Sequence, residues 1–236
     1  MSRNPATQVI RTITVWPIAA KLAALLFVAG SVANVAGVVW TKPLLMPLLL
    51  AWALVLMPTT STSGKWRLYL VAALIFSWFG DLALMNSGED WFLLGIGAFG
   101  VAQISYVLMF RIIPGFGLVK AWKLAMIPYL GYWLLMNVVL TPGDLRIPVL
   151  IYSALLVGMA LGALDVALKL KTPWRLVPAI GAALFVFSDS LIALNEFNTF
   201  DVFPALIMFT YLVGQALIIG GVILGQTPTA SDSRSF

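Results

Sequence analysis

The chain has 236 residues, of which 61% are hydrophobic and 10% charged, and its mean hydropathy is +1.01. Soluble domains are only about 45–50% apolar, so this composition predicts an integral membrane protein. Because the chain has no Cys and no His, disulfides, thiolate chemistry, imidazole bases and the usual zinc ligand sets are excluded. The net charge of +5 is typical of cytoplasmic loops rich in Lys and Arg and does not indicate nucleic acid binding.

The chain divides into a cytoplasmic N-terminal segment at 1–17, a transmembrane domain at 18–225 and a Thr- and Ser-rich tail at 226–236 that we expect to be disordered. Eight apolar runs predict an all-α polytopic membrane protein with eight transmembrane helices. The runs are Leu22–Trp40, Leu44–Met57, Leu68–Met85, Trp91–Ile113, Leu124–Leu140, Ile147–Leu168, Leu176–Leu194 and Val202–Leu224. A cleavable signal peptide is the alternative for the first run, but signal cores usually span only about 7–15 residues.

The second run is short for a membrane span, and a re-entrant segment is its alternative. The distribution of charge favours a span. With eight spans and a cytoplasmic N-terminus, only Lys42 and Arg146 of the 14 Lys and Arg residues lie outside. Without the second span most of these cations lie outside, contrary to the positive-inside rule. We therefore expect a multi-pass protein of the cell membrane with both termini cytoplasmic.

Two aspartates interrupt apolar runs, Asp81 in IFSWFGDLALMN at 75–86 and Asp189 in GAALFVFSDSLIALNEF at 181–197. A carboxylate near the bilayer centre costs roughly 2.5–3.5 kcal/mol, so a chain that keeps one has a partner or a function for it. Both runs cross from inside to outside and place their aspartate at a similar depth below the outer end. We predict that the two carboxyls face one another across a polar cavity in the outer half. The residues expected around it are Lys42 and Gln215, with Asn34, Asn86 and Asn195 near the same end.

The spacing of these residues suggests an internal duplication. Asp81 and Asp189 lie four helices apart on runs of the same direction, and the next helix carries Gln103 in one case and Gln215 in the other. This pattern predicts a parallel repeat of four plus four helices about an axis along the membrane normal.

Other patterns have simpler explanations than a ligand site. GIGAFG at Gly95–Gly100 fits the dinucleotide-binding GxGxxG pattern, but it lies inside an apolar helix, where small residues let helices pack closely. Gly158 and Gly162 are interpreted as a helix contact in the same way. Asp165 precedes Lys169 by four residues, which predicts an ion pair on one helix.

Five stretches, in order along the chain, carry a resemblance to a known family. They are TKPLLMPLL at 41–49, FSWFGDLALM at 76–85, FLLGIGAFGVAQISYVLMF at 92–110, GAALFVFSDSLIALNEF at 181–197 and TYLVGQALI at 210–218. In these motifs the chain resembles the YhhN family of eight-helix membrane proteins, whose characterised members are lysoplasmalogenases. The family often has His, within AHxxY, where this chain has Gln103 within AQISY.

The resemblance implies hydrolysis of the vinyl ether bond of a lysoplasmalogen to a fatty aldehyde and a glycerophospho head group. Two carboxyls in different protonation states can deliver the proton and activate the water without a metal or a cofactor. Asp81 and Asp189 are the expected catalytic pair, and which of them is the acid is left open. The residues expected to bind the lysophospholipid are Lys42, Asn86, Gln103, Tyr106, Ser188, Asn195, Tyr211 and Gln215.

Two alternatives remain at this stage. Lys42 is placed to hold the lipid phosphate, but an interfacial lysine that only reaches toward the head groups explains its position almost as well. The protein as a whole could also be a transporter or a lipid-binding protein that uses the aspartates for proton or cation coupling. Transporters have helix breaks at matching positions of their repeats, and Pro47 and Pro128 do not match. The sequence therefore favours an enzyme, and it leaves the oligomeric state open.

Overall fold

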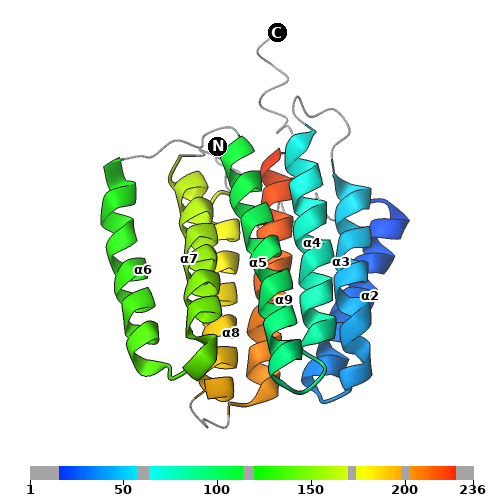
Figure 1. The fold of residues 1–236 in the computed structure, drawn as a ribbon. Helices are drawn as coiled ribbons and strands as arrows, with labels where there is room; N and C mark the ends of the chain where they lie inside the picture. The colour runs from blue at the N-terminus through cyan, green and yellow to red at the C-terminus, as the bar shows by residue number, and fades with distance from the viewer. Residues whose placement is uncertain (1–15, 58–63, 114–119, 170–173, 198–201, 227–236) are drawn as a thin grey trace.

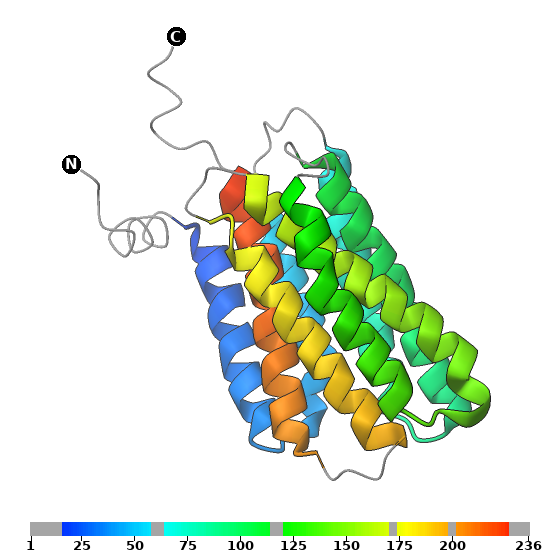
Figure 2. The same cartoon turned by 90° about the vertical axis from the view of Figure 1, so that its left-hand side faces the viewer.

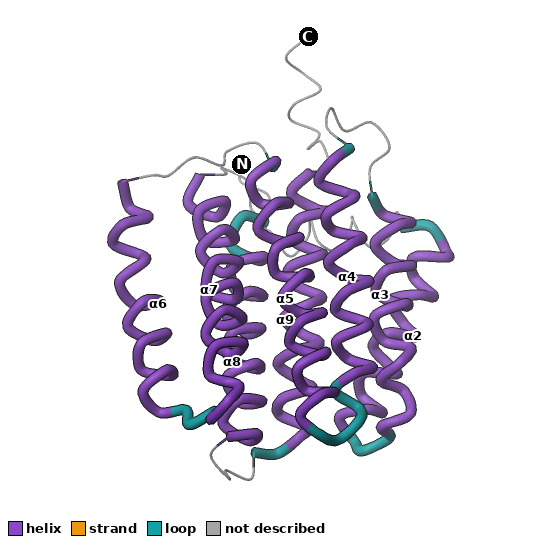
Figure 3. Tube along the Cα trace, in the orientation of Figure 1, coloured by secondary structure: helices purple, strands orange, loops and turns teal. Residues whose placement is uncertain are grey.

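The computed structural model describes residues 16–57, 64–113, 120–169, 174–197 and 202–226. In these ranges the chain forms α-helices and two short 3-10 helices but no strand, so the predicted all-α class is confirmed (Figure 3). The α-helices are α2 (Ile18–Val35), α3 (Lys42–Leu56), α4 (Lys65–Ala83), α5 (Glu89–Ile112), α6 (Lys120–Val139), α7 (Arg146–Lys169), α8 (Val177–Phe197) and α9 (Pro204–Gln226). The 3-10 helices are η1 (Val39–Thr41) and η2 (Gly143–Leu145). Nearly all of the predicted segment at 1–17 and tail at 226–236 lies outside the described residues.

The helices stand side by side in a bundle, and helices that follow one another in the chain run in opposite directions (Figures 1 and 2). The beginning of α2 and the end of α9 lie at the same end of the bundle, the upper end in Figure 1. We call the opposite end, where α2, α4, α6 and α8 terminate, the lower end. The helix α6 lies on one flank and packs mainly against α7.

Seven of the described helices are long and apolar enough to cross a membrane, as expected of a multi-pass membrane protein. The short second run is among them, because η1 extends it to Val39–Leu56. In α6 the apolar part is shorter and covers Met126–Val139. Eight spans, the internal repeat and the side of the membrane on which the termini lie therefore stay predictions.

The first apolar run, expected as one helix over Leu22–Trp40, is divided in two. The helix α2 ends at Val35, and Gly37 then adopts a φ of 99°, a left-handed conformation that only glycine reaches without steric cost. The chain turns there and continues through η1 into α3, which has Pro43 in its first turn, a favourable position for proline. The turn at Gly37 thus places Lys42 at the lower end, at the start of α3.

Small residues bring two helix pairs into close contact. A Cβ atom added to Gly95 of α5 would lie 2.6 Å from the side chain of Leu84, just beyond α4. Between α8 and α9, a Cβ atom added to Gly181 would lie 2.7 Å from the backbone oxygen of Gly214. These contacts confirm the packing explanation for the first glycine of GIGAFG, and they join α4 to α5 and α8 to α9.

The predicted ion pair on α7 is also present. The Lys169 Nζ lies 2.7 Å from the Asp165 Oδ2, one helical turn away. This pair lies near the upper end of the bundle, whereas Asp81 and Asp189 lie toward the lower end, so it belongs to a different part of the molecule.

Candidate active site

A cavity of about 1390 Å³ lies at the lower end of the bundle, among α2, η1, α3, α4, α5, α8 and α9. Most small-molecule sites have volumes of about 300–1,000 Å³, so this cavity has room for a larger ligand such as a lipid. The polar or charged side chains in its lining are Asn34, Lys42, Asp81, Asn86, Ser87, Asp189, Asn195, Glu196 and Tyr211. The fold therefore brings both aspartates and Lys42 to one cavity.

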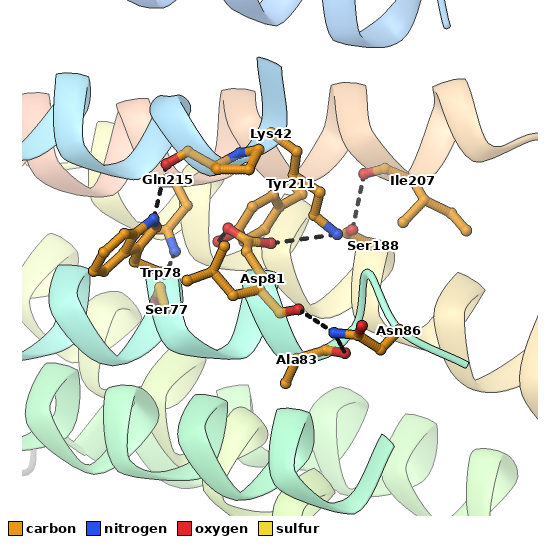
Figure 4. A network of polar contacts seen from close by, with 12 residues as sticks. Lys42, Ser77, Trp78, Asp81, Ala83, Asn86, Ser188, Ile207, Tyr211 and Gln215 are labelled. Carbon is orange, nitrogen blue, oxygen red and sulfur yellow. Dashed lines mark hydrogen bonds and ion pairs between the residues drawn. The ribbon is translucent and has the colours of Figure 1, made fainter. Parts of the chain in front are cut away.

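Asp81, near the end of α4, is almost completely buried in the wall of the cavity. The Lys42 Nζ lies 3.7 Å from its Oδ1, and the Tyr211 hydroxyl donates a hydrogen bond to its Oδ2 at 2.8 Å (Figure 4). Lys42 is the first residue of α3, and the Trp78 Nε1 holds this helix against α4 by donating to the Pro43 carbonyl oxygen at 2.8 Å. Three helices thus fix Asp81 beside a cation and a hydroxyl.

Asp189 lines the same cavity from α8. The hydroxyl of Tyr152 on α7 donates a hydrogen bond to its Oδ2. In the described part of the chain no Lys or Arg forms an ion pair with Asp189. The surroundings of Asp189 are therefore less charged than those of Asp81.

A buried polar network lies next to Asp81. The Tyr106 hydroxyl of α5 donates to the Gln215 Oε1 of α9 at 2.5 Å. The Gln215 Nε2 donates to the Ser77 Oγ of α4 at 3.1 Å (Figure 4). All three residues are fully buried, and none of them lines the cavity. Tyr106 and Gln215, which we expected to bind substrate, instead join three helices behind Asp81.

Gln103 of α5 has a comparable place near Asp189. Its side chain is fully buried beside the Tyr152 hydroxyl, but neither of its polar atoms reaches a described residue with normal hydrogen-bond geometry. Like Gln215, it does not line the cavity. In this structure the glutamine in the AQISY motif lies beside a neighbour of Asp189 and does not face the cavity itself.

The remaining predicted binding residues divide between the cavity and the helix contacts. Asn86 and Asn195 line the cavity, and both side chains also bond to backbone groups. The Asn86 Nδ2 donates to the Leu82 carbonyl oxygen of α4, and the Asn195 Oδ1 accepts from the Val202 N–H just before α9. The Ser188 hydroxyl donates to the backbone oxygen of Ile207 on α9 at 3.0 Å and does not line the cavity (Figure 4). The predicted binding residues that share the cavity with the aspartates are thus Lys42, Asn86, Asn195 and Tyr211.

Tyr152 is the site residue that the sequence analysis missed. In the sequence it is one tyrosine within the apolar run Ile147–Leu168, and nothing in that run indicates a partner on α8. The same is true of an aromatic cluster beside the aspartates, in which the rings of Phe99, Phe185 and Tyr211 pack edge to face at centroid distances of 5.4 to 6.2 Å. Both features depend on contacts between helices that are distant in the sequence.

Comparison with known proteins shows to which family the chain belongs. The sequence model of the YhhN family matches residues 38–222, more than three quarters of the chain. The chain belongs to the YhhN family. Human lysoplasmalogenase TMEM86A is 30% identical to it over 167 residues, which are 67% of each of the two chains. No solved structure shows significant similarity to it.

The matched YhhN region contains the main residues of the cavity. It begins just before η1 and ends within α9, so it includes Lys42, Asp81 and Asp189, whereas α2 precedes it. Two of the motifs that suggested the YhhN family, at 76–85 and 181–197, lie at the end of α4 and in α8. These are the helices that carry the two aspartates.

Proposed function

We propose that this protein hydrolyses the vinyl ether bond of lysoplasmalogens within the membrane and releases a fatty aldehyde and a glycerophospho head group. The observation that carries this proposal is the pair Asp81 and Asp189, which line one large cavity together with Lys42. The similarity to human lysoplasmalogenase TMEM86A supports the same reaction.

The lining of the cavity suits a lysophospholipid. Asn86 and Asn195 provide polar groups at the lower end, and Lys42 provides the positive charge for the phosphate. Phe79 and Leu94 also line the cavity, and they are 48% and 60% exposed. The alkenyl chain can therefore lie along these side chains toward the surrounding lipid. In such a pose the ether bond, which joins the alkenyl chain to the glycerol, lies between the polar groups at the lower end and the apolar side chains, near the aspartates.

The chemistry needs one acid and one source of negative charge. An acid first protonates the enol carbon, and water then adds to the carbon next to the ether oxygen, where the positive charge has formed. We assign the proton to Asp189 and the negative charge to Asp81, because Lys42 lies beside Asp81 and favours its charged form. The Asp81 carboxylate then stabilises the oxocarbenium ion electrostatically.

The alternative, a transporter that couples to protons or cations, has less support. Transporters place the side chains that bind protons or cations on helices that are broken near the middle of the membrane. The helices with the aspartates, α4 and α8, run without interruption, and the interior prolines Pro47 and Pro128 lie in α3 and α6. Continuous helices around a cavity favour an enzyme that binds its lipid in place.

The purified protein in detergent, supplied with a lysoplasmenyl lipid, tests the proposal through the release of fatty aldehyde. The matched control is the lysolipid with a saturated alkyl ether, which has the same head group and chain length but no double bond to protonate. We expect aldehyde from the first lipid only. Folded protein that binds the vinyl ether lipid but releases no aldehyde would contradict the proposed function.

The same assay in deuterium oxide tests the order of the chemistry. If protonation of carbon is the slow step, turnover is slower in deuterium oxide, and one solvent deuterium is found on the alpha carbon of the aldehyde. Aldehyde without deuterium at that carbon would exclude protonation of the enol carbon.

A further inference from the structure

A second, smaller chamber lies on the α7 side of Asp189. Its volume is about 40 Å³, and it lies among α5, α7, α8 and the end of α4. The side chains that line both this chamber and the main cavity are Leu84, Phe92, Phe99, Asp189 and Ile192. These shared residues lie where the two spaces adjoin, and Asp189 is the polar residue among them.

The chamber has the size and the polar groups that an ordered water needs. One water needs roughly 10–15 Å³ and two to four polar partners, whereas a cavity lined only by apolar groups stays dry. Asp189 and Tyr152 are the two polar residues in the lining, and the others are apolar or aromatic. Since the Tyr152 hydroxyl donates to one carboxyl oxygen of Asp189, the second carboxyl oxygen and the phenol oxygen are both available to form hydrogen bonds with a water.

We propose that this chamber holds the water molecule that adds to the lipid. The inference rests on the proposed function. A lysolipid that fills the main cavity displaces the water there, yet hydrolysis consumes one water for each lipid. The chamber can supply this water from the other side of Asp189, next to the group that has just released its proton.

The reaction is balanced with Asp189 acting twice. Its carboxylic acid gives a proton to the enol carbon and becomes a carboxylate, which leaves an oxocarbenium ion. The water oxygen then bonds to the carbon next to the ether oxygen, and one water proton passes to Asp189 and restores the acid. The resulting hemiacetal loses the glycerophospho alcohol as its C–O bond breaks, with the hydroxyl proton moving to the leaving oxygen. The sequence of acid and then base is the one that retaining glycosidases use.

Competition between water and methanol tests where the nucleophile comes from. Methanol that adds to the oxocarbenium ion gives a mixed acetal of the lysolipid, which mass spectrometry separates from the aldehyde. Val149 and Ala193 line the chamber but not the main cavity. We expect Val149→Ala, which enlarges the chamber, to raise the acetal share about tenfold, and Ala193→Val, which fills it, to lower the share, as one or two methyl groups do in other tight pockets.

Matched variants in the main cavity provide the control. Val35 and Ala205 line that cavity but not the chamber, so Val35→Ala and Ala205→Val should leave the acetal share at the wild-type value. The share is a ratio of two products, so it does not depend on how much of each variant folds. An equal share in wild type, Val149→Ala and Ala193→Val, zero included, or a larger change in the control variants, would overturn the water site. No turnover of the lysoplasmenyl lipid by wild type would instead overturn the proposed function.

Discussion

Asp81 and Asp189 line the same cavity from helices of the same direction, but their neighbours differ. Asp81 has the Lys42 ammonium at 3.7 Å and a hydrogen bond from Tyr211. Asp189 accepts a hydrogen bond from Tyr152, and within the described ranges it has no ion pair. Asp189 also borders the small chamber, which Asp81 does not. Two groups of the same chemistry can therefore take different roles, one as a fixed charge and one as a carrier of protons.

The source of the difference is visible in the helices that face the aspartates. On α9, Tyr211 precedes Gln215 by four residues, and its hydroxyl reaches Asp81. On α5 the residue four positions before Gln103 is Phe99, which has no hydroxyl to donate. Asp189 receives its hydrogen bond from Tyr152 of α7 instead. The site is thus asymmetric although the two aspartates have similar places in the chain.

The largest effect is expected from removing either carboxyl. Asp189→Asn keeps the shape but cannot transfer the proton, and Asp81→Asn removes the charge, so each should lower kcat by about 10²- to 10⁴-fold. The double variant should be little worse than either single one, because groups that act as a unit are not additive. Single-turnover release of aldehyde measures these losses, with lipid binding as the control for folding. A variant of either aspartate that retains turnover would show that its carboxyl is structural.

A smaller loss is expected when the cation beside Asp81 is removed. Lys42→Met should lower kcat/KM by about 10- to 100-fold, the usual value of a hydrogen bond to a charged group, because both Asp81 and the lipid phosphate lose a partner. Lys42→Arg keeps the charge and should recover part of the activity. If Lys42 only anchors the start of α3 at the membrane surface, Lys42→Met would reduce the amount of inserted protein but leave the kinetics of the inserted protein unchanged.

The helices and the aspartates could be predicted because both depend on local patterns. The apolar run Leu68–Met85 has the length of a membrane span, and the corresponding helix is α4 at Lys65–Ala83. The carboxyl of Asp81 is conspicuous within that run because burial of a charge in lipid is costly. The end of the first run could not be found in this way, because hydropathy does not register the turn at Gly37.

Contacts between helices could not be predicted from the same patterns. Spacing along a helix indicates which residues share a face, but it does not show what lies opposite that face. Tyr106 and Gln215 were expected to bind the lipid, and Gln215 to line the cavity, yet their side chains bond to each other. Together they satisfy polar groups that would otherwise be buried without a partner. Tyr152 was missed for the same reason, since its role depends on the packing of α7 against α8.

The smallest effects should come from substitution of the two tyrosines. These variants allow the most direct comparison of the aspartates, because each tyrosine donates a hydrogen bond to one of them. Tyr152→Phe and Tyr211→Phe each remove one hydroxyl from a carboxyl and preserve the ring. Tyr152→Phe should lower kcat by about tenfold, because Asp189 then has no other hydrogen-bond donor among the described side chains. Tyr211→Phe should cost roughly two- to threefold, since Asp81 keeps the Lys42 ammonium.

The two tyrosine variants should also differ once Lys42 is changed. In the Lys42→Met background Tyr211 is the one remaining partner of Asp81 among the described side chains. Tyr211→Phe should then become as costly as Tyr152→Phe is in the wild type, whereas the cost of Tyr152→Phe should stay the same. Measurement of kcat for the wild type, the three single variants and the two double variants gives both coupling values. Equal costs of Tyr211→Phe in the two backgrounds would mean that Lys42 does not support Asp81, and the difference between the two aspartates would then have to come from the chamber beside Asp189 alone.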